Sequence, residues 1–345
     1  MPASAKTKNF SGHGSDRPLS IGLLFDREED YAEATGPADR FAEFEPESTI
    51  RAMEKAVYRA GHRPLRIGSP RKMLYDIPET GPDLIWNIAE GYGTRNREAW
   101  APVLCELHGI PFLGSDALTL SVALDKVLTK HLARSLDIPT PDWQVVTSAV
   151  QDPALPWPVF LKPRYEGTAK GISERSIVRN RKEFRHESQR LLDLYEQDVL
   201  AECFLEGPEF TCAMAGSPLK PLPVLERSLH DSGIGSHAMA NRGDRLGHAL
   251  TSDLEETISR WSGTLCRFLG VLDFARLDFK MTAGGELMFL EINPLPTFGI
   301  DSTFAILAEM EGIPYTEYLA GILNASVRRL QDQKILPRKS SKTIG

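Results

Sequence analysis

Short apolar runs alternate with helical patterns over the first third of this chain of 345 residues, and no other feature of the sequence constrains the fold as strongly. Residues 21–25 (IGLLF) and 84–88 (LIWNI) are mostly apolar and precede polar residues, as is typical of buried strands. A helical pattern covers residues 46–60, and a second helix is predicted over 97–108. This order of elements predicts a parallel, Rossmann-like α/β domain over residues 20–114.

The rest of the chain predicts two further subdomains, over residues 115–203 and 204–332, that mix helices with strands. The predicted strands are 159–163, 199–203, 209–213, 222–226, 275–281 and 287–292, and the predicted helices are 123–136, 255–269, 302–311 and 315–330. A Gly284-Gly285 turn joins the last two strands as a hairpin. Residues 1–19 are polar and predict a flexible leader, and residues 333–345 predict a mobile tail rich in Lys and Arg.

The composition narrows the class of partner. With 40 Lys and Arg against 47 Asp and Glu, the formal net charge is -7, so the chain lacks the basic surface of a general nucleic-acid binder. No stretch approaches the roughly 18 apolar residues that a membrane span needs. The four cysteines form no CxxC pair and are typical of free thiols in a reducing compartment. We therefore expect a cytoplasmic protein that acts on small molecules and has no nucleic-acid or membrane partner.

Four polar residues gather on the predicted hairpin. Arg276 and Asp278 lie two apart on one strand, and Glu291 and Asn293 lie two apart on the other, so each pair points to one face. Oxygen ligands without His or Cys suit magnesium, which takes one or two carboxylates and completes its shell with phosphates and water. On spacing alone, an exposed sheet face with ordinary ion pairs is an equal alternative.

A second cluster begins where the strand at 159–163 ends. Lys162 closes the strand, and the loop that follows contains Gly167, Gly171 and the hydroxyl of Thr168. Glycine lets backbone N–H groups approach phosphates closely, and the lysine adds a positive charge. The segment does not match the P-loop pattern, and taken by itself a plain surface loop is at least as good an interpretation.

A third cluster covers residues 201–210, where a strand breaks at Gly207-Pro208. The break exposes backbone donors and acceptors that suit an adenine, and Glu209 suits a ribose hydroxyl. Taken alone, a turn between two strands is the favoured interpretation.

Together the three clusters resemble the ATP-grasp superfamily and, within it, the D-alanine–D-alanine ligases. The resemblance runs from residue 21 to residue 323. Its strongest passages are Gly114-Ser115-Asp116 through Asp125-Lys126 to Lys130, Lys162-Pro163 with Glu166-Gly167, Gly207-Pro208-Glu209-Phe210, Arg276-Leu277-Asp278-Phe279 and Glu291-Ile292-Asn293-Pro294. It implies a mixed α/β, three-domain fold in which ATP lies between two antiparallel sheets.

The resemblance also implies the residues that bind ATP. Lys126 and Lys162 would contact its phosphates, under a loop that includes Glu166, Gly167 and Thr168. Glu202 and the backbone of Cys203, Phe204 and Leu205 would hold adenine, and Glu209 the ribose.

The remaining implied residues act on the metal and the substrates. Asp278, Glu291 and Asn293 would bind Mg2+, or Mn2+ in its place. Arg276 would stabilise the tetrahedral oxyanion. Ser302 matches the Ser that contacts the second substrate's carboxylate, and Thr168 keeps the hydroxyl of the family's Ser in the Gly-rich loop.

The implied reaction is an ADP-forming ligation. A small-molecule carboxylate attacks the γ-phosphate of ATP, an amine then attacks the acyl phosphate, and phosphate leaves as the amide forms. Because water would destroy the intermediate, the loops 166–171 and 229–250 are predicted to close over it. The resemblance further suggests a homodimer formed through the first domain.

The substrate half departs from the family. Ala169 is followed by Lys170, where a small apolar residue is usual, and Thr297 replaces a Gly. The loop 229–250 has no Tyr, only histidines that are interpreted as solvated (His230, His237 and His248). Three residues compete for the role of the Glu that orients substrate: Glu43, Glu45 and Glu47. Trp86 and Asn87 fit a core role or a pocket role equally well.

We therefore predict a ligase for an amino acid, peptide or other carboxylate that is not the pair of D-alanines. A true D-alanine–D-alanine ligase of cell-wall precursor synthesis is one alternative. A non-catalytic ATP-binding regulatory protein that keeps the fold is the other.

Overall fold

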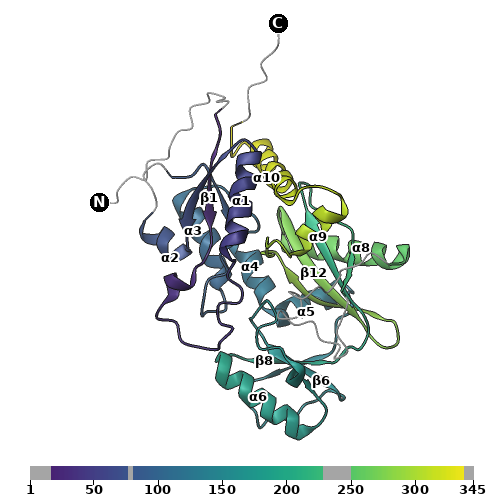
Figure 1. Cartoon of the computed structure of the whole chain (residues 1–345). Coiled ribbons are helices and arrows are strands. Elements are labelled where there is room, and N and C mark those ends of the chain that lie inside the picture. The colour runs from purple at the N-terminus through teal and green to yellow at the C-terminus, as the bar shows by residue number, and fades with distance from the viewer. Residues whose placement is uncertain (1–16, 77–80, 228–249, 338–345) are drawn as a thin grey trace.

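The computed structural model describes residues 17–76, 81–227 and 250–337. Three sheets organise these residues (Figure 1). The first sheet is parallel and has the order β2 (Arg63–Gly68), β1 (Ser20–Leu24), β3 (Leu84–Asn87) and β4 (Phe112–Leu113). Its helices are α1 (Glu47–Arg59), α2 (Pro70–Tyr75) and α3 (Trp100–His108), with 3-10 turns at Glu28–Tyr31 and Arg97–Ala99. The predicted Rossmann-like α/β arrangement is therefore present, and β2, α2 and β4 are additions to the prediction.

The second sheet is antiparallel and lies at the bottom of Figure 1. Its order is β5 (Trp143–Val146), β8 (Val199–Cys203), β6 (Val159–Pro163) and β7 (Ile177–Val178). Helix α6 (Arg181–Tyr195) covers it, and a 3-10 turn spans Glu174–Ser176. The α6 segment was not predicted as a helix because it is largely polar and buries only a narrow stripe that includes Phe184 and Leu191.

The third sheet is also antiparallel and has the order β10 (Lys220–Pro221), β9 (Glu209–Ala215), β12 (Phe274–Met281) and β13 (Leu287–Asn293). β11 (Leu225–Arg227) pairs with β9. The helices of this part are α8 (Ser252–Leu269), α9 (Thr303–Met310) and α10 (Tyr315–Asp332). Of the strand predicted over 222–226, only Leu225 and Glu226 lie in a strand, β11, and residues 222–224 form no regular element.

The predicted hairpin is confirmed in its register. Arg276 pairs with Asn293 and Asp278 with Glu291, while Leu277 between them is fully buried. Alternation of side chains along a strand explains this arrangement, because residues two apart share a face and the one between enters the core.

The single helix predicted over 123–136 is wrong. The structure has α4 (Ala117–Leu124) and α5 (Lys126–Ser135), which meet at Asp125. The backbone of Asp125 is extended, and its Oδ1 accepts hydrogen bonds from the N–H groups of Val127 and Leu128. Asp125 is therefore the N-cap of α5. Its side chain bonds to backbone N–H groups of α5 and so favours the start of a new helix rather than the continuation of α4.

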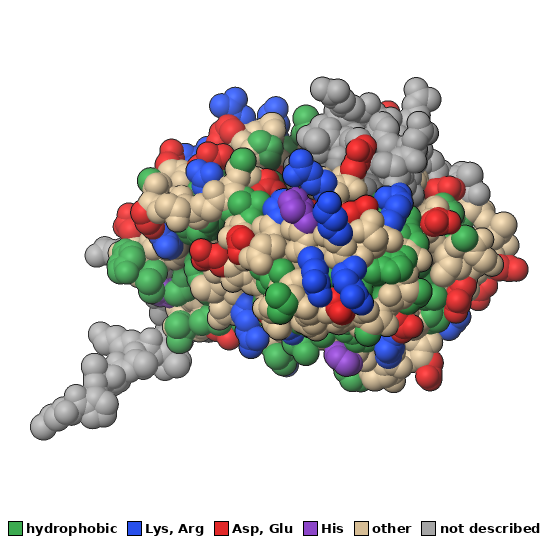
Figure 2. Space-filling model, turned by 90° about the horizontal axis from the view of Figure 1, so that it is seen from below, with side chains coloured by type: hydrophobic (Ala, Val, Ile, Leu, Met, Phe, Trp, Pro, Cys, Tyr) green, Lys and Arg blue, Asp and Glu red, His purple; other side chains and the backbone are tan. Residues whose placement is uncertain are grey.

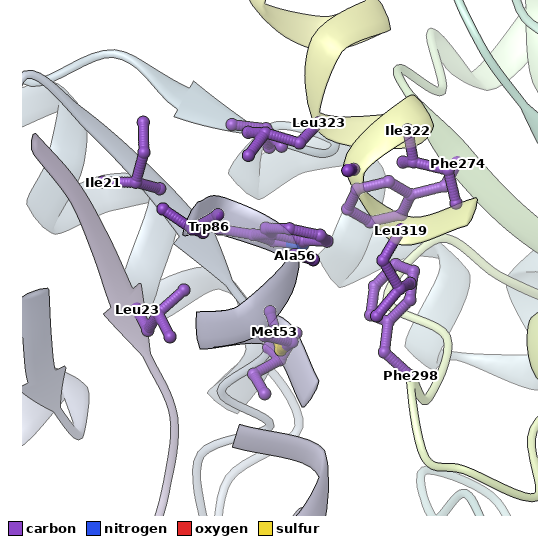
Figure 3. Close-up of a cluster of buried hydrophobic side chains, with 14 of the residues drawn as sticks. Ile21, Leu23, Met53, Ala56, Trp86, Phe274, Phe298, Leu319, Ile322 and Leu323 are labelled. Atoms are coloured by element: carbon purple, nitrogen blue, oxygen red, sulfur yellow. The ribbon is translucent and has the colours of Figure 1, made fainter. Parts of the chain in front are cut away.

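One hydrophobic cluster joins the first sheet to the C-terminal part of the chain. Figure 3 shows Trp86 of β3 close to Leu319 and Leu323 of α10, with Phe298 nearby. The Trp86 ring meets Phe298 edge-on at 5.5 Å between ring centroids. Trp86 is fully buried and does not line the cavity described below, so of its two interpretations the core role holds. Asn87 Oδ1 accepts a hydrogen bond from Ala89 N at the strand end.

The described ends of the chain are packed. Leu19 and Leu336 are both buried in the same hydrophobic cluster, so the predicted leader and tail do not extend to these residues. Residues 1–16 and 338–345 of those segments lie outside the described part, as do residues 228–249 with His230, His237 and His248.

The surface carries charges of both signs. On the face seen in Figure 2, Lys and Arg side chains alternate with Asp and Glu. No helix within the described residues is long and apolar enough to cross a membrane. All four cysteines are free thiols, as predicted; Cys105, Cys212 and Cys266 are buried and Cys203 is partly exposed.

Candidate active site

A cavity of about 490 Å3 opens between the two antiparallel sheets. β6 and β8 line it from one side, and β12 and β13 line it from the other. We call this part, together with residues 166–171, the nucleotide end. Residues 42–46 and Ser48, together with Thr297 and residues 299–303, line the rest, which we call the acceptor end.

Asp278 and Glu291 face each other across β12 and β13. Arg276 Nη2 lies 3.1 Å from Asp278 Oδ2, and Thr211 Oγ1 donates a 2.7 Å hydrogen bond to Asp278 Oδ1. Burial acts to raise the pKa of Glu291, but Lys126, Lys162 and Arg276 together hold it below its usual value. Two carboxylates and a guanidinium are thus gathered on the one face that the strand period predicts.

The donor set suits a hard divalent cation. No group of three or more His, Cys, Asp and Glu side chains within the described ranges is arranged to hold a metal. Two carboxylates are what magnesium commonly takes from a protein when phosphates and water supply its other ligands. Asn293 is not among the residues that line the cavity, and its Oδ1 accepts a hydrogen bond from Leu295 N.

Opposite the carboxylates, Glu202 forms ion pairs with two buried lysines. Its oxygens lie 2.5 Å from Lys130 Nζ and 2.8 Å from Lys162 Nζ. Burial acts to raise the pKa of Glu202, yet the two ammonium groups hold it at about 2. Lys126 extends toward the other strand pair, where its Nζ lies 3.7 Å from Glu291 Oε2. Positive charges therefore separate Glu202 from Glu291.

The segment after Glu202 continues along the cavity wall. The N–H groups of Cys203 and Phe204 donate to the carbonyl oxygens of Asp142 and Pro158. Contacts of these two residues with a nucleotide would therefore fall to their carbonyl oxygens. Further along, Lys280 Nζ lies 5.7 Å from the centre of the Phe204 ring and 3.9 Å from Glu209 Oε2. Burial raises the pKa of Glu209.

Comparisons with known proteins agree with this geometry. The model of the family described as "D-ala D-ala ligase C-terminus" matches residues 132–324, more than half of the chain. The D-alanine–D-alanine ligase of Halorhodospira halophila is 31% identical over 254 residues, which cover 72% of this chain and 81% of that protein. This chain belongs to the D-alanine–D-alanine ligase family. It is therefore an ATP-dependent, ADP-forming, amide-forming ligase of the ATP-grasp fold.

Other relatives in the family cover more of the chain at lower identity. The D-alanine–D-alanine ligase of Aquifex aeolicus is 28% identical over 281 residues, 80% of this chain and 93% of its own length. Among solved structures, the Bacillus anthracis D-alanine–D-alanine ligase complexed with ATP superposes with a TM-score of 0.69 at 19% identity, covering 91% of this chain and 99% of that one. At that identity the structural likeness bears on the fold alone.

Nearly all of the residues assigned from the family resemblance converge on the cavity. Those that line it are Lys126, Lys162, Glu166, Gly167, Thr168, Glu202, Cys203, Phe204, Leu205, Glu209, Arg276, Asp278, Glu291 and Ser302. Asn293 is the exception. Their convergence brings together segments that are up to 176 residues apart in the chain, from Lys126 to Ser302.

The structure separates the three candidates for the orienting Glu of the family. Glu47 is exposed and pairs with Arg66 at 2.8 Å, outside the cavity. Glu43 lines the cavity, but its carboxylate already forms ion pairs with Arg97 and Lys170. Glu45 also lines the cavity and accepts a 3.0 Å hydrogen bond from Phe298 N.

Glu45 differs from the other two because its hydrogen-bond donors are neutral. Burial raises its pKa, against the opposing effects of Phe298 N and the hydroxyl of Thr297. Ser302 lines the same end, where it is the N-cap of α9 and its Oγ lies 3.4 Å from Tyr315 OH. Thr297, which replaces the family's Gly, therefore contacts the carboxylate of the acceptor end.

Sequence reasoning gave no site role to Lys280, Lys130 or Arg97. A signal for Lys280 was present, because Arg276, Asp278 and Lys280 lie at steps of two along β12 and so share a face. Lys130 lies one turn beyond Lys126 on α5, on the same side of the helix. No local pattern marks Arg97, whose partners are distant in the sequence.

Proposed function

We propose that this chain activates a carboxylate substrate as an acyl phosphate and joins it to an amine, with Mg2+ as cofactor. One observation carries the proposal: the Asp278 and Glu291 carboxylates line the same cavity as the ammonium groups of Lys126 and Lys162, and Lys126 Nζ lies 3.7 Å from Glu291 Oε2. This is the arrangement that phosphoryl transfer requires, because the transferred phosphoryl group is stabilised by positioning and by charge.

The residues divide between the two steps. Lys126 and Lys162 would hold the ATP phosphates, and Asp278 with Glu291 would hold magnesium, which neutralises phosphate charge when it is bound. Arg276 lies against Asp278 on the cavity wall and would stabilise the oxyanion that forms when the amine attacks the acyl carbon. The backbone of 203–205 would hold adenine and Glu209 the ribose.

The substrates enter at the acceptor end. Glu45 has only neutral hydrogen-bond partners among the described residues, so it is available to pair with the ammonium group of an amino-acid substrate. Ser302 would contact a carboxylate at the same end. We therefore propose that both substrates are amino acids or short peptides.

We further propose that the substrates are not a pair of D-alanines. Thr297 contacts Glu45, and Lys170 lies in the Gly-rich loop, whereas the family usually has smaller residues at both positions. D-Alanine–D-alanine ligation, named for many relatives of this chain, is the second candidate. The non-catalytic alternative is disfavoured, because the charged residues assigned to ATP and magnesium line one cavity.

The test is ADP and phosphate formation from ATP and Mg2+, screened over pairs of amino acids and dipeptides that include D-alanine. We expect turnover with at least one pair other than two D-alanines. Turnover with D-alanine alone would contradict the substrate proposal and keep the ligation chemistry. No stimulation by any pair would contradict the proposal as a whole.

A further inference from the structure

The phosphate loop, residues 166–171, is attached to a segment of the first domain, residues 39–43. Gly167 N donates a 2.7 Å hydrogen bond to Glu43 Oε1, and Gly171 N donates a 3.0 Å hydrogen bond to Asp39 Oδ2. A Cβ at Gly167 would lie 2.7 Å from Glu43 Oε1, so any larger residue there would displace this carboxylate. The loop and the segment are therefore in direct contact.

Lys170 stands at the centre of this attachment. Its Nζ lies 3.0 Å from Glu43 Oε2 and also pairs with Glu166 of its own loop. All three side chains are largely buried. Burial acts to raise the pKa of Glu43, but Arg97 and Lys170 hold it at about 2. The pair is thus fully charged at neutral pH.

Arg97 also binds the Glu43 carboxylate. Its guanidinium donates to Glu43 Oε1 at 2.7 Å and to the carbonyl oxygen of Tyr165 at 2.8 Å. Buried charges persist when each has partners, and here two carboxylates and two cations alternate. The attachment is therefore an ionic network and not an incidental surface contact.

We propose that Lys170 is a positioning residue that locks the phosphate loop onto the first domain and so holds the loop over the nucleotide end before ATP binds. The proposal rests on the proposed function only for the identity of the ligand.

The conformation of the loop supports this role. Thr168 and Ala169 both have positive φ values, of 50° and 54°, which non-glycine residues adopt only at a cost and which persist when the surroundings enforce them. Lys170 follows these two residues directly, so its ion pair with Glu43 holds the strained segment at its end. A methionine at this position has a similar stem but no charge with which to do so.

The ion pair between Lys170 and Glu43 also links the two ends of the cavity. Glu43 lies two residues before Glu45, which lines the acceptor end. A displacement of the phosphate loop is therefore expected to move the segment that carries Glu45.

The experiment is hydrogen–deuterium exchange of the peptide that spans residues 164–171 in the full chain, combined with calorimetric titration of Mg-ADP. In Lys170→Met we expect exchange of the loop amides to be about tenfold faster and ADP affinity about tenfold lower, within the usual range of coupling between sites. Glu43 keeps Arg97 in this variant, and Glu166 keeps Arg97 at 3.8 Å, so neither carboxylate is left alone.

Two variants control for nonspecific effects. Lys170→Arg keeps the charge and should restore slow exchange. Glu317→Gln removes an exposed ion pair between α10 and Arg59 of α1, and should change neither measurement. If Lys170→Met fails to fold, Glu43→Gln tests the same pair from the other side and should also speed exchange.

The outcomes separate the two proposals. A folded Lys170→Met or Glu43→Gln variant with wild-type loop exchange and wild-type ADP affinity would show that Lys170 does not hold the loop. Exchange as fast in Lys170→Arg as in Lys170→Met would overturn the role of charge. A wild-type chain that does not bind Mg-ADP would contradict the proposed function, while loop exchange would still decide whether Lys170 holds the loop.

Discussion

The two ends of the cavity are built from different kinds of structure. At the nucleotide end, most of the charged side chains stand on paired strands of two sheets, where the register of the strands sets their spacing. At the acceptor end, Glu45 and Ser302 come from connecting segments that belong to distant parts of the chain. Regular elements hold groups more precisely than loops do, and loops tolerate more change. We infer that this fold can keep its nucleotide chemistry, which depends on strands, while the connecting segments that contact its substrates change.

The largest effect is expected at the nucleotide end. Glu291→Gln removes one of the two carboxylates proposed to hold magnesium, and we expect ADP formation to fall by about 1,000-fold, similar to losing one preorganised charge-stabilising group. Glu286→Gln, in the exposed turn of the same hairpin, is the matched control. Steady-state ADP release checks both variants. Full activity in Glu291→Gln would show that the strand-borne carboxylate does not hold the metal.

Lys162→Met tests the wall of the cavity that β6 and β8 form, opposite Glu291. The variant removes a charge proposed to hold ATP phosphates and leaves Glu202 paired with Lys130 alone. We expect kcat/KM for ATP to fall by about 100-fold, equivalent to about 3 kcal/mol. Lys182→Met, on the exposed face of α6, should behave as wild type. A variant with unchanged ATP kinetics would remove Lys162 from the phosphate site.

Glu45→Gln tests whether the two ends of the cavity act separately, because it changes a side chain of the acceptor end alone. We expect KM for the amino-acid substrate to rise by about tenfold, as for one lost hydrogen-bonded charge interaction, and KM for ATP to stay within a factor of two. Glu47→Gln, two residues away and outside the cavity, is the control. If Glu45→Gln raised KM for ATP instead, the proposed division of the cavity into two ends would be wrong.

The smallest effect concerns stability. Burial raises the pKa of Glu98 to about 7, and burial together with the charge of Glu98 raises the pKa of Glu90. The folded chain then retains a proton that the unfolded chain releases above pH 4.5, so stability falls as pH rises from about 4.5 to 7.

Between pH 5.5 and 8.0 we expect Glu98 to lower the free energy of unfolding by about 2 kcal/mol, since one pKa unit corresponds to about 1.4 kcal/mol. Urea unfolding at the two pH values, compared between wild type and Glu98→Gln, isolates this contribution. The same pH dependence in both proteins would mean that Glu98 is ionised, like Glu202 at the nucleotide end.

The parts of the fold that follow from local rules were predictable. A strand period of two and a Gly-Gly turn were enough to place Arg276, Asp278 and Glu291 on one face, and the structure has that register. The break between α4 and α5 was missed, because Asp125 reads as an ordinary helix residue until its side chain caps the next helix. Helix α6 was missed because few of its residues are apolar.

The sequence by itself determined the nucleotide end, because its charges lie at fixed spacings along individual strands and the family resemblance supplied their order. Only the tertiary structure distinguishes Glu45 from Glu43 and Glu47 by its hydrogen-bond partners, and only the tertiary structure pairs Lys170 with Glu43. Glu43 and Lys170 lie 127 residues apart, and nothing in the local pattern of either residue points to the other. Their pairing depends on how the first domain packs against the second sheet, which is a property of the assembled core and not of any one segment.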